Sequence, residues 1–261
     1  MKRLAIKTIT TLLGLAMYVN VGAADNSIYI DQTGDNATIN VTQDGAGNRV
    51  RGLQGVGTGN TTPALINGNN ISVDITQVGA DNVLNLGVNT GTANGGVPTS
   101  IVYSVSGGSN TGTINLNGPN SGTNLSTALS VTQSGGSNLA SVNILGSGNS
   151  LTATQSGGSA TLSSTVNATD TTQTINTSGG TANSVTTNLT GDKGTVDVTF
   201  VGASNTAGIT QSGGGTAGHS TTLDVTGSSN SYTINQSGTI DTTVNIKTNG
   251  SGNTYTVTTH N

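Results

Sequence analysis

Residues 149–157 read Asn-Ser-Leu-Thr-Ala-Thr-Gln-Ser-Gly, and the frame of this stretch decides the fold. The frame is Asn-x-apolar-x-apolar-x-Gln-x-Gly, and its other best copies begin at Asn26, Asn205 and Asn230. Apolar residues at every second position indicate a strand with one buried face. The glycine and its small polar neighbours are typical of a turn that needs positive φ angles.

The frame recurs along the chain, mostly at steps of eleven or twelve residues. We place its starts at residues 26, 37, 48, 60, 71, 82, 99, 110, 127, 138, 149, 160, 171, 183, 194, 205, 219, 230, 242 and 253. The longer steps predict loops near residues 87–98, 119–126 and 214–218. A short, fixed period is the signature of a solenoid, because each repeat buries its apolar face only against its neighbours.

Two strand-and-turn arcs make one flattened rung of the predicted solenoid. Between residues 127 and 166 the glutamine slot alternates, because Gln133 and Gln155 are separated by Ile144 and followed by Val166. We therefore predict an all-β, cross-β solenoid over residues 25–261, with strand-turn-strand rungs of about 22 residues and roughly ten rungs.

The amide side chains of the frame share the parity of its apolar residues, so they are expected to face inward. A buried amide is costly unless it is hydrogen-bonded, and identical amides stacked at the rung spacing can bond to the copies above and below. We predict a structural amide ladder made of Asn26, Gln32, Gln43, Asn48, Gln54, Gln77, Asn82, Gln133, Asn138, Asn149, Gln155, Asn205, Gln211, Asn230, Gln236 and Asn253. The predicted turn glycines are Gly34, Gly45, Gly79, Gly135, Gly157, Gly213 and Gly238.

Residues 1–24 are typical of a secretory signal peptide. Lys2, Arg3 and Lys7 form a basic start, residues 8–21 are mostly apolar or small, and residues 22–24 offer a cleavage site. We expect the mature chain to begin near Asp25. It would contain no Cys, Trp, Met or Glu, and its four basic and eleven acidic residues give a net charge of −7 (4 − 11). This composition excludes a disulfide framework and argues against a nucleic-acid partner.

The residues that could carry chemistry are sparse. His219 and His260 are the two histidines, and no metal-ligand spacing surrounds them. No serine lies in a nucleophile-elbow context, and most aspartates fall in turns or at outward positions of strands. We predict no enzymatic activity, no cofactor, no metal and no small-molecule substrate. Among the aromatic residues, Tyr103, Tyr232 and Tyr255 occupy inward slots, whereas Tyr29 is expected to point outward.

Gln43-x4-Asn48-x5-Gln54, preceded by the inward Ile39 and Val41, resembles the repeat of curlins, the amyloid subunits of bacterial curli. The curlin motif is Ser-x5-Gln-x4-Asn-x5-Gln, and partial matches begin at Gln77 and Gln133. The resemblance implies an exported subunit that starts unfolded, crosses the periplasm and leaves through an outer-membrane secretion pore. It further implies homopolymerisation at the cell surface into biofilm fibres, with a nucleator as a second partner.

The favoured interpretation is therefore a secreted structural subunit that polymerises by edge templating. The last frame, from Asn253 to the end of the sequence, is expected to leave an uncovered strand edge. The alternative is a monomeric β-solenoid adhesin or an ice-binding protein, because Thr42, Thr76, Thr132, Thr154 and Thr210 occupy one outward slot. A hydrolytic β-helix is a more distant alternative.

Overall fold

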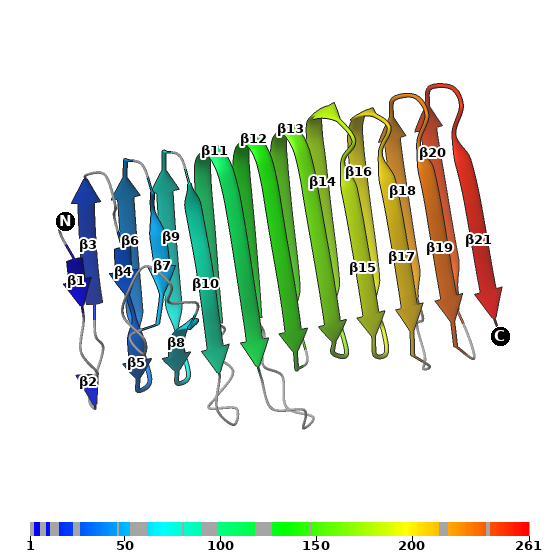
Figure 1. Ribbon diagram of the computed structural model, residues 1–261. Helices are drawn as coiled ribbons and strands as arrows, with labels where there is room; N and C mark the ends of the chain where they lie inside the picture. The colour runs from blue at the N-terminus through cyan, green and yellow to red at the C-terminus, as the bar shows by residue number, and fades with distance from the viewer. Residues whose placement is uncertain are drawn as a thin grey trace.

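The protein is a flat β-solenoid whose strands lie side by side from the N-terminal to the C-terminal end of the stack (Figure 1). The computed structural model describes residues 3–5, 9–10, 16–22, 27–45, 47–52, 62–79, 81–89, 99–117, 127–146, 148–213, 219–238 and 241–260. All regular elements in these ranges are strands, which confirms the predicted all-β solenoid class. None of the described ranges contains a helix long and apolar enough to cross a membrane.

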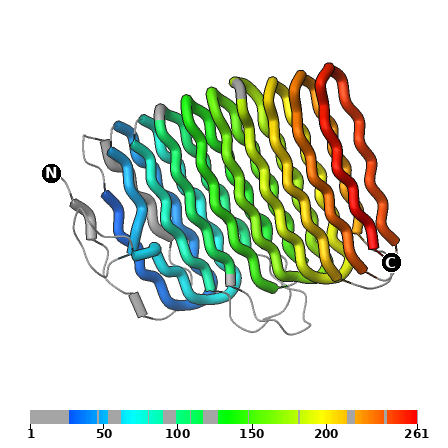
Figure 2. The backbone as a smooth tube through the Cα atoms, turned by 45° about the vertical axis from the view of Figure 1, so that its right-hand side comes forward, coloured from blue at the N-terminus to red at the C-terminus, as the bar shows by residue number. Residues whose placement is uncertain are grey.

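The strands form two faces, and successive turns of the coil stack on one another (Figure 2). The first face comprises β3 (Ala16–Gly22), β6 (Thr38–Asp44), β9 (Ser72–Val78), β14 (Thr172–Thr181), β16 (Thr195–Ala203), β18 (Ser220–Thr226) and β20 (Thr243–Asn249). The second face comprises β1 (Arg3–Ala5), β2 (Ile9–Thr10), β4 (Ser27–Tyr29), β5 (Asp31–Thr33), β7 (Arg49–Arg51), β8 (Ala64–Asn67), β10 (Asn82–Asn89), β15 (Ser184–Thr190), β17 (Thr206–Ser212), β19 (Ser231–Ser237) and β21 (Thr254–His260). Three long strands begin on the first face and end on the second: β11 (Thr99–Asn117), β12 (Thr127–Leu145) and β13 (Ser150–Asn167).

Every pairing between rungs is parallel, as a solenoid requires. Ala128 pairs with Ser150, so the rung step there is 22 residues (150 − 128). Thr38 pairs with Ser72, so the step between β6 and β9 is 34 residues (72 − 38) and includes an insertion. Insertions do not disturb the register of the strands, because they project from the stack at the turns or between short strands.

Alternate side chains of each strand are buried between the two faces. In β12 and β13 the burial pattern alternates along both halves of the strand, which matches the period-two pattern of the sequence. Ile75, Leu151 and Val198 are examples of inward aliphatic residues that are at most 1% exposed. A one-residue slip of any strand would turn this apolar row to solvent, so the pattern fixes the register.

The frames placed at residues 48 and 60 are not separate arcs, which corrects the sequence-based division. Both β7 and β8 pair with the same strand, since Val83 lies opposite Arg49 and Leu86 lies opposite Ala64. The chain between β7 and β8 is therefore an insertion within one arc, and residues 53–61 of it lie outside the described residues.

The aromatic residues differ in how far they are buried. Tyr29 was expected to point outward, and it is in register with the outward Arg51, yet it is only 4% exposed. Tyr255 is 37% exposed although it occupies an inward slot, because β21 belongs to the last rung and only one neighbour covers it. Tyr103 and Tyr232 are buried, as predicted.

Candidate functional site

The two corners of the solenoid are chemically different. At one corner, which we call the asparagine corner, a first-face strand turns into a second-face strand. At the other, which we call the loop corner, the chain returns to the first face. Described frames that open at the asparagine corner begin with Asn48, Asn82, Asn110, Asn138, Ala160, Asn183, Asn205, Asn230 and Asn253. Asparagine is therefore concentrated along one edge of the stack.

Asn82 shows what one asparagine of this corner contributes. Its Nδ2 donates to the carbonyl oxygen of Gly79 in its own turn at 2.8 Å and to Asn110 Oδ1 in the next rung at 2.8 Å. Its Oδ1 accepts from Asn48 Nδ2 at 2.8 Å. One fully buried side chain therefore closes its turn and joins three rungs, which offsets the cost of burying the amide.

These bonds form two runs of a ladder along the asparagine corner. The first run continues from Asn82 through Asn110 to Asn138, with an Asn110 Nδ2 to Asn138 Oδ1 distance of 2.7 Å. It ends there because the next slot is Ala160, and Asn138 Nδ2 keeps the bond to a serine carbonyl of the next rung, here Ser156, that Asn110 also makes to Ser134. The second run joins Asn183, Asn205, Asn230 and Asn253, and its middle link is made by the backbone N–H of Asn205, which donates to Asn230 Oδ1.

The glutamines form pairs rather than one continuous ladder. Gln77 donates to Gln43, Gln155 to Gln133 and Gln236 to Gln211, at 2.7 to 2.8 Å between Nε2 and Oε1. Glutamine Nε2 atoms also donate to backbone carbonyls across the following turn: Gln133 Nε2 to the carbonyl of Leu139 at 3.0 Å, and Gln155 Nε2 to that of Thr161 at 3.1 Å. A glutamine at the end of a strand therefore holds the start of the next strand against it.

The structure separates the predicted amide residues into groups. Asn26 and Gln54 lie outside the described residues. Asn149 lies at the loop corner between Thr127 and Thr171, and its buried Nδ2 has no partner among the described residues. Gln32 pairs in register with Ile66, not with another glutamine. Asn149 and Gln32 are buried but take no part in the runs of amides.

Sequence reasoning left out several buried polar residues. Asn110 and Asn183 are members of the asparagine runs, and their positions at frame starts were a sufficient signal. Other bonds have no signal in the frame: Ser164 Oγ donates to Gln173 Oε1 at 2.9 Å, Thr221 Oγ1 to Gln211 Oε1 at 2.7 Å, and Tyr103 Oη to Gln77 Oε1 at 3.0 Å.

Burial suppresses ionisation of the core tyrosines. It raises the pKa of the Tyr103 hydroxyl well above its usual range, and it does the same to Tyr232, where nearby Tyr255 adds to the effect. Tyr103 therefore stays a neutral donor to Gln77, in a structural role. His219 is 2% exposed at the loop corner, and neither of its ring nitrogens has a partner among the described residues.

The turn glycines have φ angles that other residues rarely adopt. The angles of the seven predicted turn glycines lie between 119° at Gly45 and 153° at Gly238. At Gly79, Gly135 and Gly157 a Cβ atom would fall on the carbonyl oxygen of the equivalent glycine in the preceding rung. The rungs therefore approach so closely at the asparagine corner that only glycine fits there.

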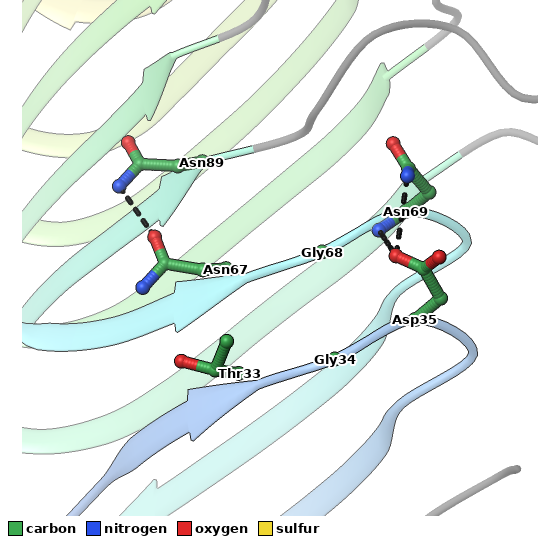
Figure 3. A pocket seen from close by; sticks show the side chains of 7 residues that line it. All are labelled: Thr33, Gly34, Asp35, Asn67, Gly68, Asn69 and Asn89. Carbon is green, nitrogen blue, oxygen red and sulfur yellow. Dashed lines mark hydrogen bonds between the residues drawn. The ribbon is translucent and has the colours of Figure 1, made fainter. Parts of the chain in front are cut away.

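The described residues contain no cluster of His, Cys, Asp and Glu that could hold a metal ion. An open groove lies at the loop corner between Thr33, Gly34 and Asp35 of one rung and Asn67, Gly68 and Asn69 of the next, with Asn89 beyond (Figure 3). Asp35 Oδ1 accepts from both Asn69 N and Nδ2, so this carboxylate joins two rungs. These hydrogen bonds of the Asp35 carboxylate hold neighbouring rungs together, which is a structural role.

The five outward threonines that share one slot of the frame are divided between the two faces. Thr42, Thr76, Thr132 and Thr154 follow one another on the first face, with Ser104 between the two pairs. Thr210 lies on the second face, beside Asn188 and Asn235. The array that ice binding would need is therefore divided between opposite faces.

The last rung is open on one side in the part of the chain that the structure describes. β20 pairs with β18, and β21 pairs with β19. The inward residues of β18 and β19 are 0% to 1% exposed, whereas Ile246 is 36% and Val257 is 44% exposed. The apolar row therefore continues to the end of the stack and is uncovered there.

Comparison with known protein families identifies a match in the middle of the chain. Residues 128–157 match the family model described as "Curlin associated repeat". No curated protein and no solved structure matched the chain. The matched residues span β12 and the first half of β13, where Gln133 donates across the turn and Gln155 donates to Gln133. The chain therefore contains a curlin-associated repeat, the repeat of curli-like structural subunits, and the resemblance to curlins is confirmed.

Proposed function

We propose that the chain is a secreted structural subunit that polymerises by edge templating into extracellular, curli-like amyloid fibres for biofilm matrix, adhesion and surface attachment. The observation that carries this proposal is the open C-terminal end of the stack. There the last rung presents an unpaired strand edge and an uncovered apolar row. A second copy that adds its own first rung would satisfy both.

The free energy of this contact has two sources. β20 and β21 would each gain a row of backbone hydrogen bonds along one edge. Covering Ile246, Tyr255 and Val257 would contribute on the order of 1 kcal/mol each, because these side chains are a third to a half exposed. Asn253 ends the second asparagine run and would extend it into the next copy.

The opposite end of the stack supports the same assembly. β1 to β3 pair with β4 to β6, and these first strands lie within the predicted signal peptide. Cleavage near Asp25 would remove them and uncover the edges of β4, β5 and β6. We propose that export thereby produces a subunit with complementary open ends, and that the secretion pore and a nucleator act before and at fibre initiation.

A charge placed on the inner row of the last rung tests end stacking. Ile246→Lys is expected to lower the rate of seeded fibre growth at least about tenfold, because stacking would bury an unpaired ammonium group. Ile246 is 36% exposed in the single chain, so the variant is expected to keep its fold. Growth is followed by thioflavin fluorescence after adding wild-type seeds to residues 25–261.

Asn245→Lys is the matched control, since Asn245 precedes Ile246 in β20 and points outward. It should grow at nearly the wild-type rate. If both variants grow alike, or if the wild-type chain stays a clear solution of β-rich monomer, stacking through the last rung is not how the protein works.

A further inference from the structure

Charged side chains are distributed unequally over the two faces of the solenoid. Outward positions of first-face strands carry Asp44 and Asp74 near the N-terminal end of the stack and Asp197, Asp224 and Lys247 near the C-terminal end, and the four first-face strands between them, from β11 to β14, are uncharged. From β4 onward, the charged residues at outward positions of described second-face strands are Asp31, Arg49 and Arg51, all in the first rungs. From β11 to β21 the second face carries no Asp, Glu, Lys or Arg in the described strands.

We call the outward surface of the second-face halves of β11, β12 and β13, together with β15, β17, β19 and β21, the charge-free plane. Its side chains are mostly Thr, Ser and Asn, with Leu139 and Leu145 on β12 and His260 at its far corner. The pairings from β13 through β21 are in continuous register, so the plane is regular.

The size of this plane fits a protein partner. Seven strands about 4.8 Å apart and about seven residues per strand give a surface of about 34 Å by 23 Å, or about 800 Å². A stable protein–protein interface buries about 800 Å² on each partner. Flat, uncharged sheet faces rich in Thr, Ser and Asn can interdigitate as dry zippers. The uncharged part of the first face spans four strands, from β11 to β14, and a contact of equal size there would have to bury carboxylates such as Asp74 or Asp197.

We propose that the charge-free plane is a lateral contact surface that pairs with the same plane of a second copy. A self-complementary patch of this kind generates a two-fold contact. The contact lies on the side of the stack, so it is separate from end-to-end stacking. In a fibre it would join two filaments, and in a soluble chain it would give a dimer. The first face, with its carboxylates, would remain towards solvent.

Gly208 offers a sharp test at the middle of this plane. It lies on β17 with an ordinary φ angle, and a Cβ atom built there would meet nothing within 4 Å. Gly208→Lys should therefore fold as well as the wild type while placing two like charges inside the paired planes. Gly208→Ser adds a side chain without charge, and Thr222→Lys adds the same charge to the first face on β18.

The readout in fibres is mass per length by electron microscopy. Wild type, Gly208→Ser and Thr222→Lys are expected to give paired filaments, and Gly208→Lys single filaments with a twofold lower mass per length. Single filaments in the wild type, or equal effects of Gly208→Lys and Thr222→Lys, would overturn the proposal.

If the wild-type chain forms no fibres, the proposal of end-to-end stacking is wrong. Lateral pairing is then tested separately, by sedimentation of the soluble protein. A wild-type dimer that becomes a monomer in Gly208→Lys supports the plane as a self-contact. A wild-type monomer overturns lateral pairing. If that monomer shows thermal hysteresis in freezing water, and Gly208→Lys abolishes the hysteresis, the plane binds ice instead.

Discussion

Gly157→Ala is expected to lower the free energy of unfolding by at least about 3 kcal/mol. Two causes act together at this position. The φ angle of Gly157 is 145°, which an alanine adopts only with strain, and the added Cβ would fall on the backbone carbonyl oxygen of Gly135. Backbone cannot move aside as a flexible side chain can, so the rungs must separate and lose hydrogen bonds along the asparagine corner.

The measurement is the urea midpoint of residues 25–261, refolded at low concentration and followed by circular dichroism. Gly208→Ala is the matched control, because Gly208 lies in a strand with an ordinary φ angle and open space around it. It is expected to be neutral or to stabilise by about 0.5–1 kcal/mol. Comparable losses in both variants would show that the close approach of rungs at the turn glycines does not limit stability.

Asn82→Ala is expected to lower the free energy of unfolding by about 2–4 kcal/mol, because the Asn82 amide joins three rungs. The variant removes the donors to Gly79 and Asn110 and the acceptor of Asn48, and it leaves their buried polar atoms without these partners. The loss should appear in the urea midpoint and as faster amide hydrogen exchange in the turns on either side of β10.

Asn149→Thr is the contrasting variant of the same residue type. Asn149 is as buried as the other asparagines, but its Nδ2 has no partner among the described residues and its neighbours in register are threonines. Replacing it should leave the urea midpoint unchanged or raise it. A cost similar to that of Asn82→Ala would contradict the division of the asparagines between the two corners.

The period of the sequence was sufficient to predict the strands, the inward row and the turns. It worked because the solenoid repeats one local interaction: alternate residues of each strand are buried, and glycine closes each turn. Leu151, Ala153 and Gln155 of the opening stretch are all fully buried, as their spacing indicates. The insertion between β7 and β8 was missed because residues 48 and 60 both begin plausible frames.

The amide contacts were harder to predict, for a physical reason. The frame repeats about every eleven residues, but the residue stacked on any given residue lies a full rung away. Asn138 and Asn149 look alike in sequence, yet they lie at opposite corners, and only Asn138 has another asparagine below it. Bonds across the core, such as that between Ser164 and Gln173, depend on how the two faces are positioned and not on the period.

The most direct test of the central claim is the axial repeat of one subunit in fibres of residues 25–261, measured by helical reconstruction in the electron microscope. If subunits stack end to end as solenoids, each copy should occupy about 45 to 50 Å of fibre axis, because roughly ten rungs lie about 4.8 Å apart. A repeat of about 4.8 Å per subunit would mean that each chain forms a single flattened layer, and it would contradict the stacked solenoid.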